Sequence, residues 1–155
     1  MSLTIGYRAA AADLLARPAP PPVSGLSVRV EHDIAAERLR ELNPDFRGAR
    51  SADLVAIAEA GARLVGYWAF TVQGDGLIDA GVHVAPDWRG RRVAALLLRA
   101  ALEAQPSTLV FARTDVRNRG SRRMLRRAGL RPHRLTGAVT LPGLGRFSLG
   151  WSRDA

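Results

Sequence analysis

The sequence predicts an α+β fold with one mixed sheet, and the order of its elements carries this prediction. Residues 26–30, 51–59, 64–72 and 77–84 have the composition and spacing of strands, and turns at 60–63 and 74–76 join the last three of them. From residue 89 onward helices alternate with strands. A meander of antiparallel strands followed by strand–helix–strand–helix–strand is typical of a mixed sheet with helices packed on it.

The first 24 residues are predicted to form a separate N-terminal extension, followed by one domain at residues 25–155. Residues 9–16 can form a short helix that ends at Arg17, because a residue before proline disfavours the helical conformation. Four prolines between residues 18 and 22 then make a stiff connector. The extension is expected to pack on the surface, or to act as an arm that is exchanged in a dimer or covers a substrate.

The other elements of the domain follow at a regular pace. A helix at 33–42 is expected to begin at Asp33, whose side chain can cap it. A longer helix at 93–104 has apolar residues at spacings of three and four, and Pro106 follows its end. The remaining predicted elements are strands at 108–114, 130–135 and 146–152, a helix at 120–128 stopped by Gly129, and a glycine-rich loop at 141–145.

Several classes of protein are excluded by composition. Apolar residues make up 47% of the chain, which is enough for a packed core. No apolar run reaches the length of a membrane span and the N-terminus lacks the pattern of a signal peptide, so the sequence predicts a cytoplasmic protein without a membrane partner. The absence of cysteine excludes disulfides and a cysteine nucleophile, and three scattered histidines predict no metal site.

The basic charge of the chain is unevenly distributed. All 23 basic residues are arginines and the formal net charge is +9, with almost all of the excess between residues 78 and 155. A basic half of this kind fits a nucleic acid, an acidic lipid or a polyanionic cofactor. No aromatic residue occurs between 112 and 146, which argues against a platform that stacks single-stranded nucleic acid.

A candidate anion site lies where the third strand of the meander leads into the long helix. Residues 89–95 (RGRRVAA) form this turn, and the first backbone N–H groups of a helix have no intrahelical partner. These donors, the helix dipole and the guanidinium groups of Arg89, Arg91 and Arg92 make the turn suited to a diphosphate. Gly90 would let phosphate oxygens approach the backbone. The simpler interpretation is a basic helix terminus exposed to solvent.

Two segments resemble the signatures of the GNAT N-acetyltransferase superfamily. Residues 82–94 (VHVAPDWRGRRVA) resemble the acyl-CoA-binding signature, in which a V-x-V-x-P strand leads into a (Q/R)-x-x-G-x-(G/A) turn. Residues 118–130 (NRGSRRMLRRAGL) resemble the second signature, in the form found in ribosomal-protein-alanine-type members. The resemblance covers residues 64–135. It implies the GNAT fold, a mixed and mostly antiparallel sheet flanked by helices, with a strand–helix–strand core that binds acyl-CoA.

The resemblance also implies acetyl-CoA as cosubstrate, bound together with the amine in a ternary complex. By analogy with the family, the N–H of Val84 or Val82 would hold the thioester oxygen as it becomes negative. Arg92 stands where glycine is usual, and Leu125 stands where many members have a tyrosine that protonates the departing thiolate. The residues implied to bind acetyl-CoA are Val82, Val84, Arg89, Gly90, Arg91, Arg92, Val93, Ala94, Ala95, Asn118 and Ser121.

Amine acylation requires a general base, because the amine must lose a proton to attack. Asp79 and His83 lie four residues apart on one predicted strand, and period-two spacing would put both on one face of the sheet. Glu59 is the third candidate base. Ser121 is expected to protonate the thiolate in place of the missing tyrosine. Each of these residues also has a purely structural interpretation. Asp79 and His83 can be hydrogen-bonded residues of the sheet, Glu59 a surface carboxylate, and Ser121 a helix serine bonded to the backbone.

The sequence therefore predicts a GNAT-fold enzyme that acetylates a primary amine of a small molecule. Acetylation of a protein or peptide N-terminus is the alternative among enzymes, suggested by the form of the second signature. From another class, a non-catalytic CoA-sensing or basic nucleic-acid-binding module would explain Leu125 and the arginines. A nucleic-acid partner is not expected for the enzyme, and a homodimer is expected only from the habit of the family.

Overall fold

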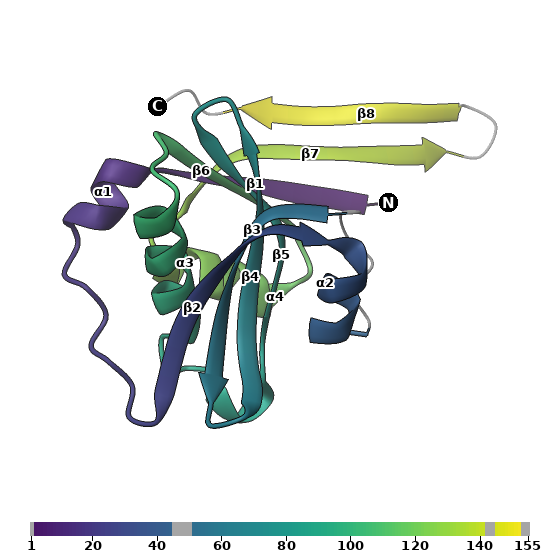
Figure 1. The fold of residues 1–155 in the computed structure, drawn as a ribbon. Coiled ribbons are helices and arrows are strands. Elements are labelled where there is room, and N and C mark those ends of the chain that lie inside the picture. The colour runs from purple at the N-terminus through teal and green to yellow at the C-terminus, as the bar shows by residue number, and fades with distance from the viewer. Residues whose placement is uncertain (1, 45–50, 142–144, 153–155) are drawn as a thin grey trace.

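The computed structural model describes residues 2–44, 51–141 and 145–152, in which eight strands form one sheet (Figure 1). The predicted loop at 141–145 falls mainly outside the described residues. The strands are β1 (Ser2–Ala10), β2 (Leu26–Ala35), β3 (Ser51–Ala60), β4 (Arg63–Gln73), β5 (Gly76–Val84), β6 (Leu109–Asp115), β7 (Arg131–Leu141) and β8 (Gly145–Ser152). The helices are α1 (Ala11–Ala16), α2 (Ala36–Leu42), α3 (Val93–Ala104) and α4 (Arg119–Ala128), with a short 3-10 helix, η1 (Pro86–Trp88).

The predicted α+β fold is confirmed. The strand order is β2-β3-β4-β5-β6-β1-β7-β8, and β5 and β6 are the only parallel neighbours among the described strands. The meander β3–β4–β5 and the alternation of α3, β6, α4 and β7 appear as predicted. The prediction at 33–42 is wrong in its first turn, because β2 continues to Ala35 and the helix begins at Ala36. Asp33 does not cap it and has a left-handed backbone with φ of 54°.

Strand β1 was not predicted from the sequence. It lies between β6 and β7 and pairs with both in antiparallel fashion, so residues 2–10 belong to the sheet rather than to a separate extension. The signal for this strand was the alternation of Leu3, Ile5 and Tyr7. The short helix predicted at residues 9–16 ends before Arg17 as expected, but it begins only at Ala11, because β1 continues to Ala10.

The helices divide unequally between the two faces of the sheet (Figure 1). Helix α3 packs across β2 to β5, α4 packs on β6 and α3, and α1 packs on α3 and β1, so these three helices share one face. Trp68 and Phe70 are fully buried in the core on that face, with their rings stacked at 5.3 Å. The short helix α2 covers part of the other face, where Tyr67 and Leu39 belong to a second apolar cluster.

The hydroxyl of Tyr7 gives a test of this core. Tyr7 is fully buried, and its Oη makes no hydrogen bond to any described residue. A buried hydroxyl without a partner costs about 1 to 3 kcal/mol. Tyr7→Phe is therefore expected to raise the free energy of unfolding by about 1 kcal/mol in urea denaturation. The control is Tyr67→Phe, which removes a hydroxyl that accepts a hydrogen bond from Asn43 Nδ2 at 3.2 Å and should lower stability. A loss of stability in Tyr7→Phe would contradict the prediction.

Candidate active site

Strands β5 and β6 separate soon after they meet. Only residues 76–78 of β5 pair with β6, although both strands continue. On its other side β5 stays paired with β4 as far as Val84. The N–H of Ala85 donates to Val65 O at 2.8 Å, so in this antiparallel ladder the backbone groups of Val82 and Val84 point away from β4. They face the gap left by β6, which is the orientation expected of oxyanion donors.

The turn after β5 exposes unpaired backbone donors. Gly90 and Arg92 both have left-handed backbones, with φ of 81° and 63°. No side chain caps α3, and the N–H of Leu96 donates to Arg92 O at 3.1 Å as the helix begins. The amides of residues 93–95 therefore have no intrahelical acceptor, and they carry the positive end of the helix dipole.

Two arginines fix the turn in place. The Nε of Arg89 donates to the carbonyl oxygen of Val84 at 3.0 Å. The guanidinium of Arg63, at the start of β4, forms two hydrogen bonds with the Asp87 carboxylate at 2.7 and 3.0 Å. This pairing lowers the pKa of Asp87 below its ordinary value. The turn is thus anchored to β4 and β5 by its own side chains.

A groove of about 1080 Å³ opens between α3, α4 and the end of β5. Ten of the eleven residues predicted to bind acetyl-CoA line it. The exception is Arg91, whose guanidinium lies over the ring of Trp88, 5.0 Å from its centroid. No carboxylate occurs among the described residues that line the groove, whereas six arginines do: Arg17, Arg89, Arg92, Arg99, Arg123 and Arg127.

Asp79 is the first residue of β5 beyond the segment paired with β6. Its Oδ1 accepts hydrogen bonds from Trp68 Nε1 at 2.8 Å and from the N–H of Gly81 at 3.0 Å. Burial raises the pKa of Asp79 from 3.8 to about 6, although the two hydrogen bonds and the charge of Arg113 lower it. Asp79 can therefore exchange a proton near neutral pH.

The prediction that Asp79 and His83 share a face of the sheet is wrong. A bulge at Ala80 inserts one extra residue into β5 and shifts its register against β4. Residues on the two sides of the bulge that are an even number of positions apart therefore point to opposite faces of the sheet. Asp79 bonds to Trp68 on the α3 face. His83 is opposite Tyr67, with ring centroids 6.3 Å apart, on the α2 face. His83 also lines the groove, whereas Asp79 is not among its lining residues.

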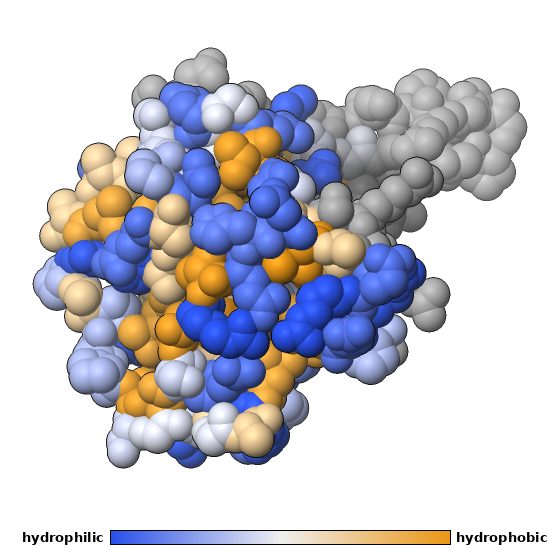
Figure 2. Space-filling model, viewed as in Figure 1, coloured by the Kyte–Doolittle hydropathy of each residue, from blue (hydrophilic) through white to orange (hydrophobic). Residues whose placement is uncertain are grey.

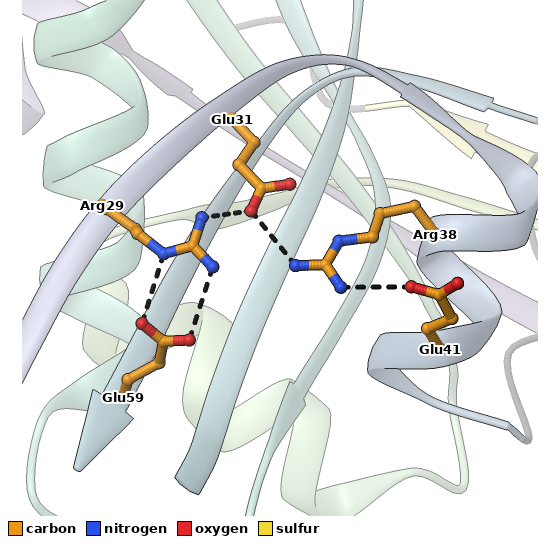
Figure 3. A network of polar contacts seen from close by, with 5 residues as sticks. All are labelled: Arg29, Glu31, Arg38, Glu41 and Glu59. Atoms are coloured by element: carbon orange, nitrogen blue, oxygen red, sulfur yellow. Dashed lines mark hydrogen bonds and ion pairs between the residues drawn. The ribbon is translucent and has the colours of Figure 1, made fainter. Parts of the chain in front are cut away.

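Glu59 lies outside the groove, in a network of ion pairs on the α2 face (Figure 3). Its carboxylate accepts from Arg29 Nε at 3.2 Å, and Arg29 also bonds to Glu31. Arg38 joins Glu31 at 3.3 Å to Glu41 at 3.1 Å. Figure 2 shows hydrophilic residues interspersed with hydrophobic ones across the middle of this side of the molecule. Glu59, on β3, is therefore paired with Arg29, two strands from the free edge of β5, and is not placed to take a proton from an amine there.

Helix α4 brings two predicted residues to the groove. Asn118 Oδ1 accepts from the N–H of Ser121 at 2.9 Å, so Asn118 caps α4. Ser121 lies in the first turn of the helix and lines the groove. One turn further, Leu125 is buried in the core and supplies packing at the position where many family members have tyrosine.

Sequence reasoning missed one wall of the groove. Leu14 of α1 and three residues of the connector, Arg17, Pro18 and Pro20, line it. They lie far from α3 and α4 in the sequence, and no local pattern pairs them with those helices. Arg99 of α3 joins the two segments, because its NH1 donates hydrogen bonds to the carbonyls of Leu15 at 3.1 Å and Arg17 at 3.3 Å.

The backbone of Arg92 gives a stability test. A left-handed conformation costs a side-chain-bearing residue about 1 kcal/mol, whereas glycine adopts it freely. Arg92→Gly is therefore expected to raise the free energy of unfolding by about 1 kcal/mol in urea denaturation. The matched control is the neighbouring Arg91→Gly, which removes the same charge where φ is not positive and should lower stability. Equal losses in the two variants would contradict the prediction.

Comparisons with known proteins show the family and the fold of this chain. Residues 13–130 match the Acetyltransferase (GNAT) family. A GCN5-related N-acetyltransferase from Kribbella flavida is 19% identical, with a TM-score of 0.58 over 84% of this chain and 56% of that one. A GCN5-related N-acetyltransferase from Sphaerobacter thermophilus is 18% identical, with a TM-score of 0.58 over 86% of this chain and 49% of that one. A tandem GNAT protein from the clavulanic acid biosynthesis pathway is 16% identical, with a TM-score of 0.63 over 85% and 50%.

The chain belongs to the GNAT acetyltransferase family, whose cosubstrate is acetyl-CoA. It spans about half the length of these structural relatives. A search of curated proteins finds no match. Among the described residues there is no helix long and apolar enough to cross a membrane. Nor do the described side chains form a group of three or more potential metal ligands.

Proposed function

We propose that this chain transfers the acetyl group of acetyl-CoA to a primary amine of a small molecule, by direct attack in a ternary complex. The groove carries the proposal, because it joins unpaired amides, arginines and the free edge of β5 in one continuous surface. Acetyl-CoA would supply an acetyl group activated as a thioester. A cytoplasmic location belongs to the same proposal.

The residues of the groove fit this cosubstrate along its length. Arg89, Arg92 and the amides at the start of α3 would bind the diphosphate, since helix N-termini and guanidiniums both favour phosphate. The free edge of β5 would pair with the amides of the pantetheine arm. The N–H of Val82 or Val84 would then hold the thioester oxygen as negative charge develops on it.

Asp79 is the general base in this proposal, and Ser121 is the proton donor to the thiolate. A base works best when its pKa lies near the pH of the reaction, and the pKa of Asp79 is raised to about 6. Asp79 lies where β5 leaves β6, next to the free edge of the strand, and would act on the amine through a water. Ser121 lines the groove, in the first turn of α4.

The N-terminus of a peptide is the second candidate acceptor, favoured by the form of the signature at residues 118–130. The first experiment is calorimetric titration with acetyl-CoA, with a short DNA duplex as a competing ligand class. Micromolar binding of acetyl-CoA alone is expected. Thiol release is then measured with panels of small amines and of peptides, and faster release with small amines is expected. Salt-sensitive binding of DNA without binding of acetyl-CoA would overturn the proposed function.

A further inference from the structure

The connector between α1 and β2 forms one wall of the groove. Its Arg17 is placed to contact a ligand that binds there. Arg17 follows directly after α1 in an extended conformation, with φ of −67° and ψ of 148°. Pro18 fixes the direction of the chain after it, because proline restricts the backbone of its predecessor as well as its own. Arg17, Pro18 and Pro20 all line the groove.

The connector is held in this position from two sides. Arg99 of α3 donates to the carbonyls of Leu15 and Arg17 at 3.1 and 3.3 Å, while its Nε bonds to Glu103 at 2.7 Å. Leu14, one turn before Arg17, is buried in the core. The hydrogen-bonding capacity of Arg99 is thus largely used within the protein.

The guanidinium of Arg17 lies against the end of α4. A Cβ added at Gly129 would overlap with Arg17 NH1 and Leu14 Cδ2, so the side chain of Arg17 occupies space that only a glycine leaves open. Arg17 is exposed, and its guanidinium makes no hydrogen bond or ion pair with any described residue. Arg127 of α4, two residues before Gly129 in the sequence, also lines the groove.

The arginines of the groove fall into two groups along α3. Arg89 and Arg92 lie at the N-terminal end of α3, whereas Arg17 lies beside Arg99, about two turns further along the helix. A diphosphate bound by Arg89 and Arg92 would leave the arginines further along α3 without an anionic partner. CoA carries one more anionic group, the phosphate on the 3′-hydroxyl of its ribose.

We propose that Arg17 of the connector, together with Arg127 of α4, binds the 3′-phosphate of the CoA cosubstrate. This inference rests on the proposed function. It gives the segment before β2 a role in ligand selection, because a CoA thioester without the 3′-phosphate would lose this contact. A charge-assisted hydrogen bond to phosphate corresponds to about a tenfold difference in affinity.

The test is a cycle of two proteins and two ligands, measured by calorimetry. Wild type is expected to bind acetyl-CoA about tenfold more tightly than 3′-dephospho-acetyl-CoA, and Arg17→Gln is expected to bind the two almost equally. Arg17→Lys keeps the charge and should keep part of the preference. Arg134→Gln is the matched control, since it removes an exposed arginine outside the groove and should leave the preference unchanged.

Each other outcome overturns a defined statement. Equal affinity of wild type for the two ligands would overturn the role of Arg17 and leave the proposed function standing. If Arg17→Gln kept the full preference for acetyl-CoA over 3′-dephospho-acetyl-CoA, the role of Arg17 would likewise be overturned and the proposed function would stand. Equal weakening of both ligands by Arg17→Gln, with a lower Tm, would show that Arg17 only stabilises the end of α4. Binding of neither ligand to wild type would overturn the proposed function and this assignment together.

Discussion

Replacing Asp79 by asparagine is expected to lower kcat at pH 7.5 by about a hundredfold or more, the usual contribution of a general base. The substitution keeps the hydrogen-bond acceptor for Trp68 and Gly81 but removes the group that takes the proton. Wild type should lose activity as the pH falls through about 6, because Asp79 is then protonated. Asp79→Asn should lack this acidic limb in a profile of kcat/KM against pH.

The same substitution has an expected effect on stability with a defined sign. The pKa of Asp79 in the folded protein lies above 3.8, so the folded protein holds this proton more tightly than the unfolded chain does. The contribution of Asp79 to the free energy of unfolding therefore falls as the pH rises from about 4 to about 6. The loss is up to about 3 kcal/mol. In urea denaturation the difference between wild type and Asp79→Asn should follow this curve and become constant above pH 7.

His83→Gln separates the two candidate bases, because the bulge at Ala80 places Asp79 and His83 on opposite faces of the sheet. If Asp79 is the base, His83→Gln retains the acidic limb near pH 6. Loss of that limb in His83→Gln, with the limb retained in Asp79→Asn, would contradict the assignment. The urea denaturation of wild type and Asp79→Asn tests the pKa of Asp79 separately, since that measurement needs no substrate.

Gly90→Asp is expected to weaken acetyl-CoA binding by about a hundredfold. The new carboxylate would lie in the turn before α3, facing the diphosphate. Repulsion between unit charges about 5 Å apart near a protein surface is about 3 kcal/mol, which corresponds to that loss. Calorimetric titration with acetyl-CoA measures the effect, and it should become smaller at high salt.

Gly74→Asp is the matched control for this substitution. Gly74 also has a positive φ, 58° against 81° at Gly90, and at both glycines an added Cβ would meet no atom within 4 Å. The two variants therefore have similar backbone costs and the same change in charge. Gly74 lies in the turn between β4 and β5, outside the groove, so its substitution should leave binding intact. Equal losses from both variants would contradict a diphosphate site at Gly90.

Most of the fold could be predicted from the sequence because it depends on local patterns. The continuous apolar runs of β3 and β4 and the apolar spacing of α3 report burial directly, and turn residues separate these elements. The turn at residues 89–95 could be assigned to anion binding because helix amides, glycine and arginine are adjacent in the sequence.

The features that could not be predicted depend on contacts between distant segments or on a single inserted residue. The bulge at Ala80, which moves Asp79 to the face opposite His83, has one mark in the sequence of β5: Gly81, a glycine inside a strand, with φ of 147°. Glu59 appears in the sequence as a free carboxylate, whereas its partner Arg29 lies on the neighbouring strand. The position of Arg17 follows from Arg99 and Gly129, both more than eighty residues away.

The position of β1 between β6 and β7 constrains how the chain folds as it is made. Thr4 pairs with Asp115 and Ser2 with Ala138, so β1 leaves the ribosome long before either neighbour. The meander of β3, β4 and β5 joins neighbouring residues and can form early, whereas these pairings have a high contact order and form late. Until then, β1 exposes an apolar strand that can pair with other chains. Strand β1 can therefore take its place between β6 and β7 only after β7 has been translated.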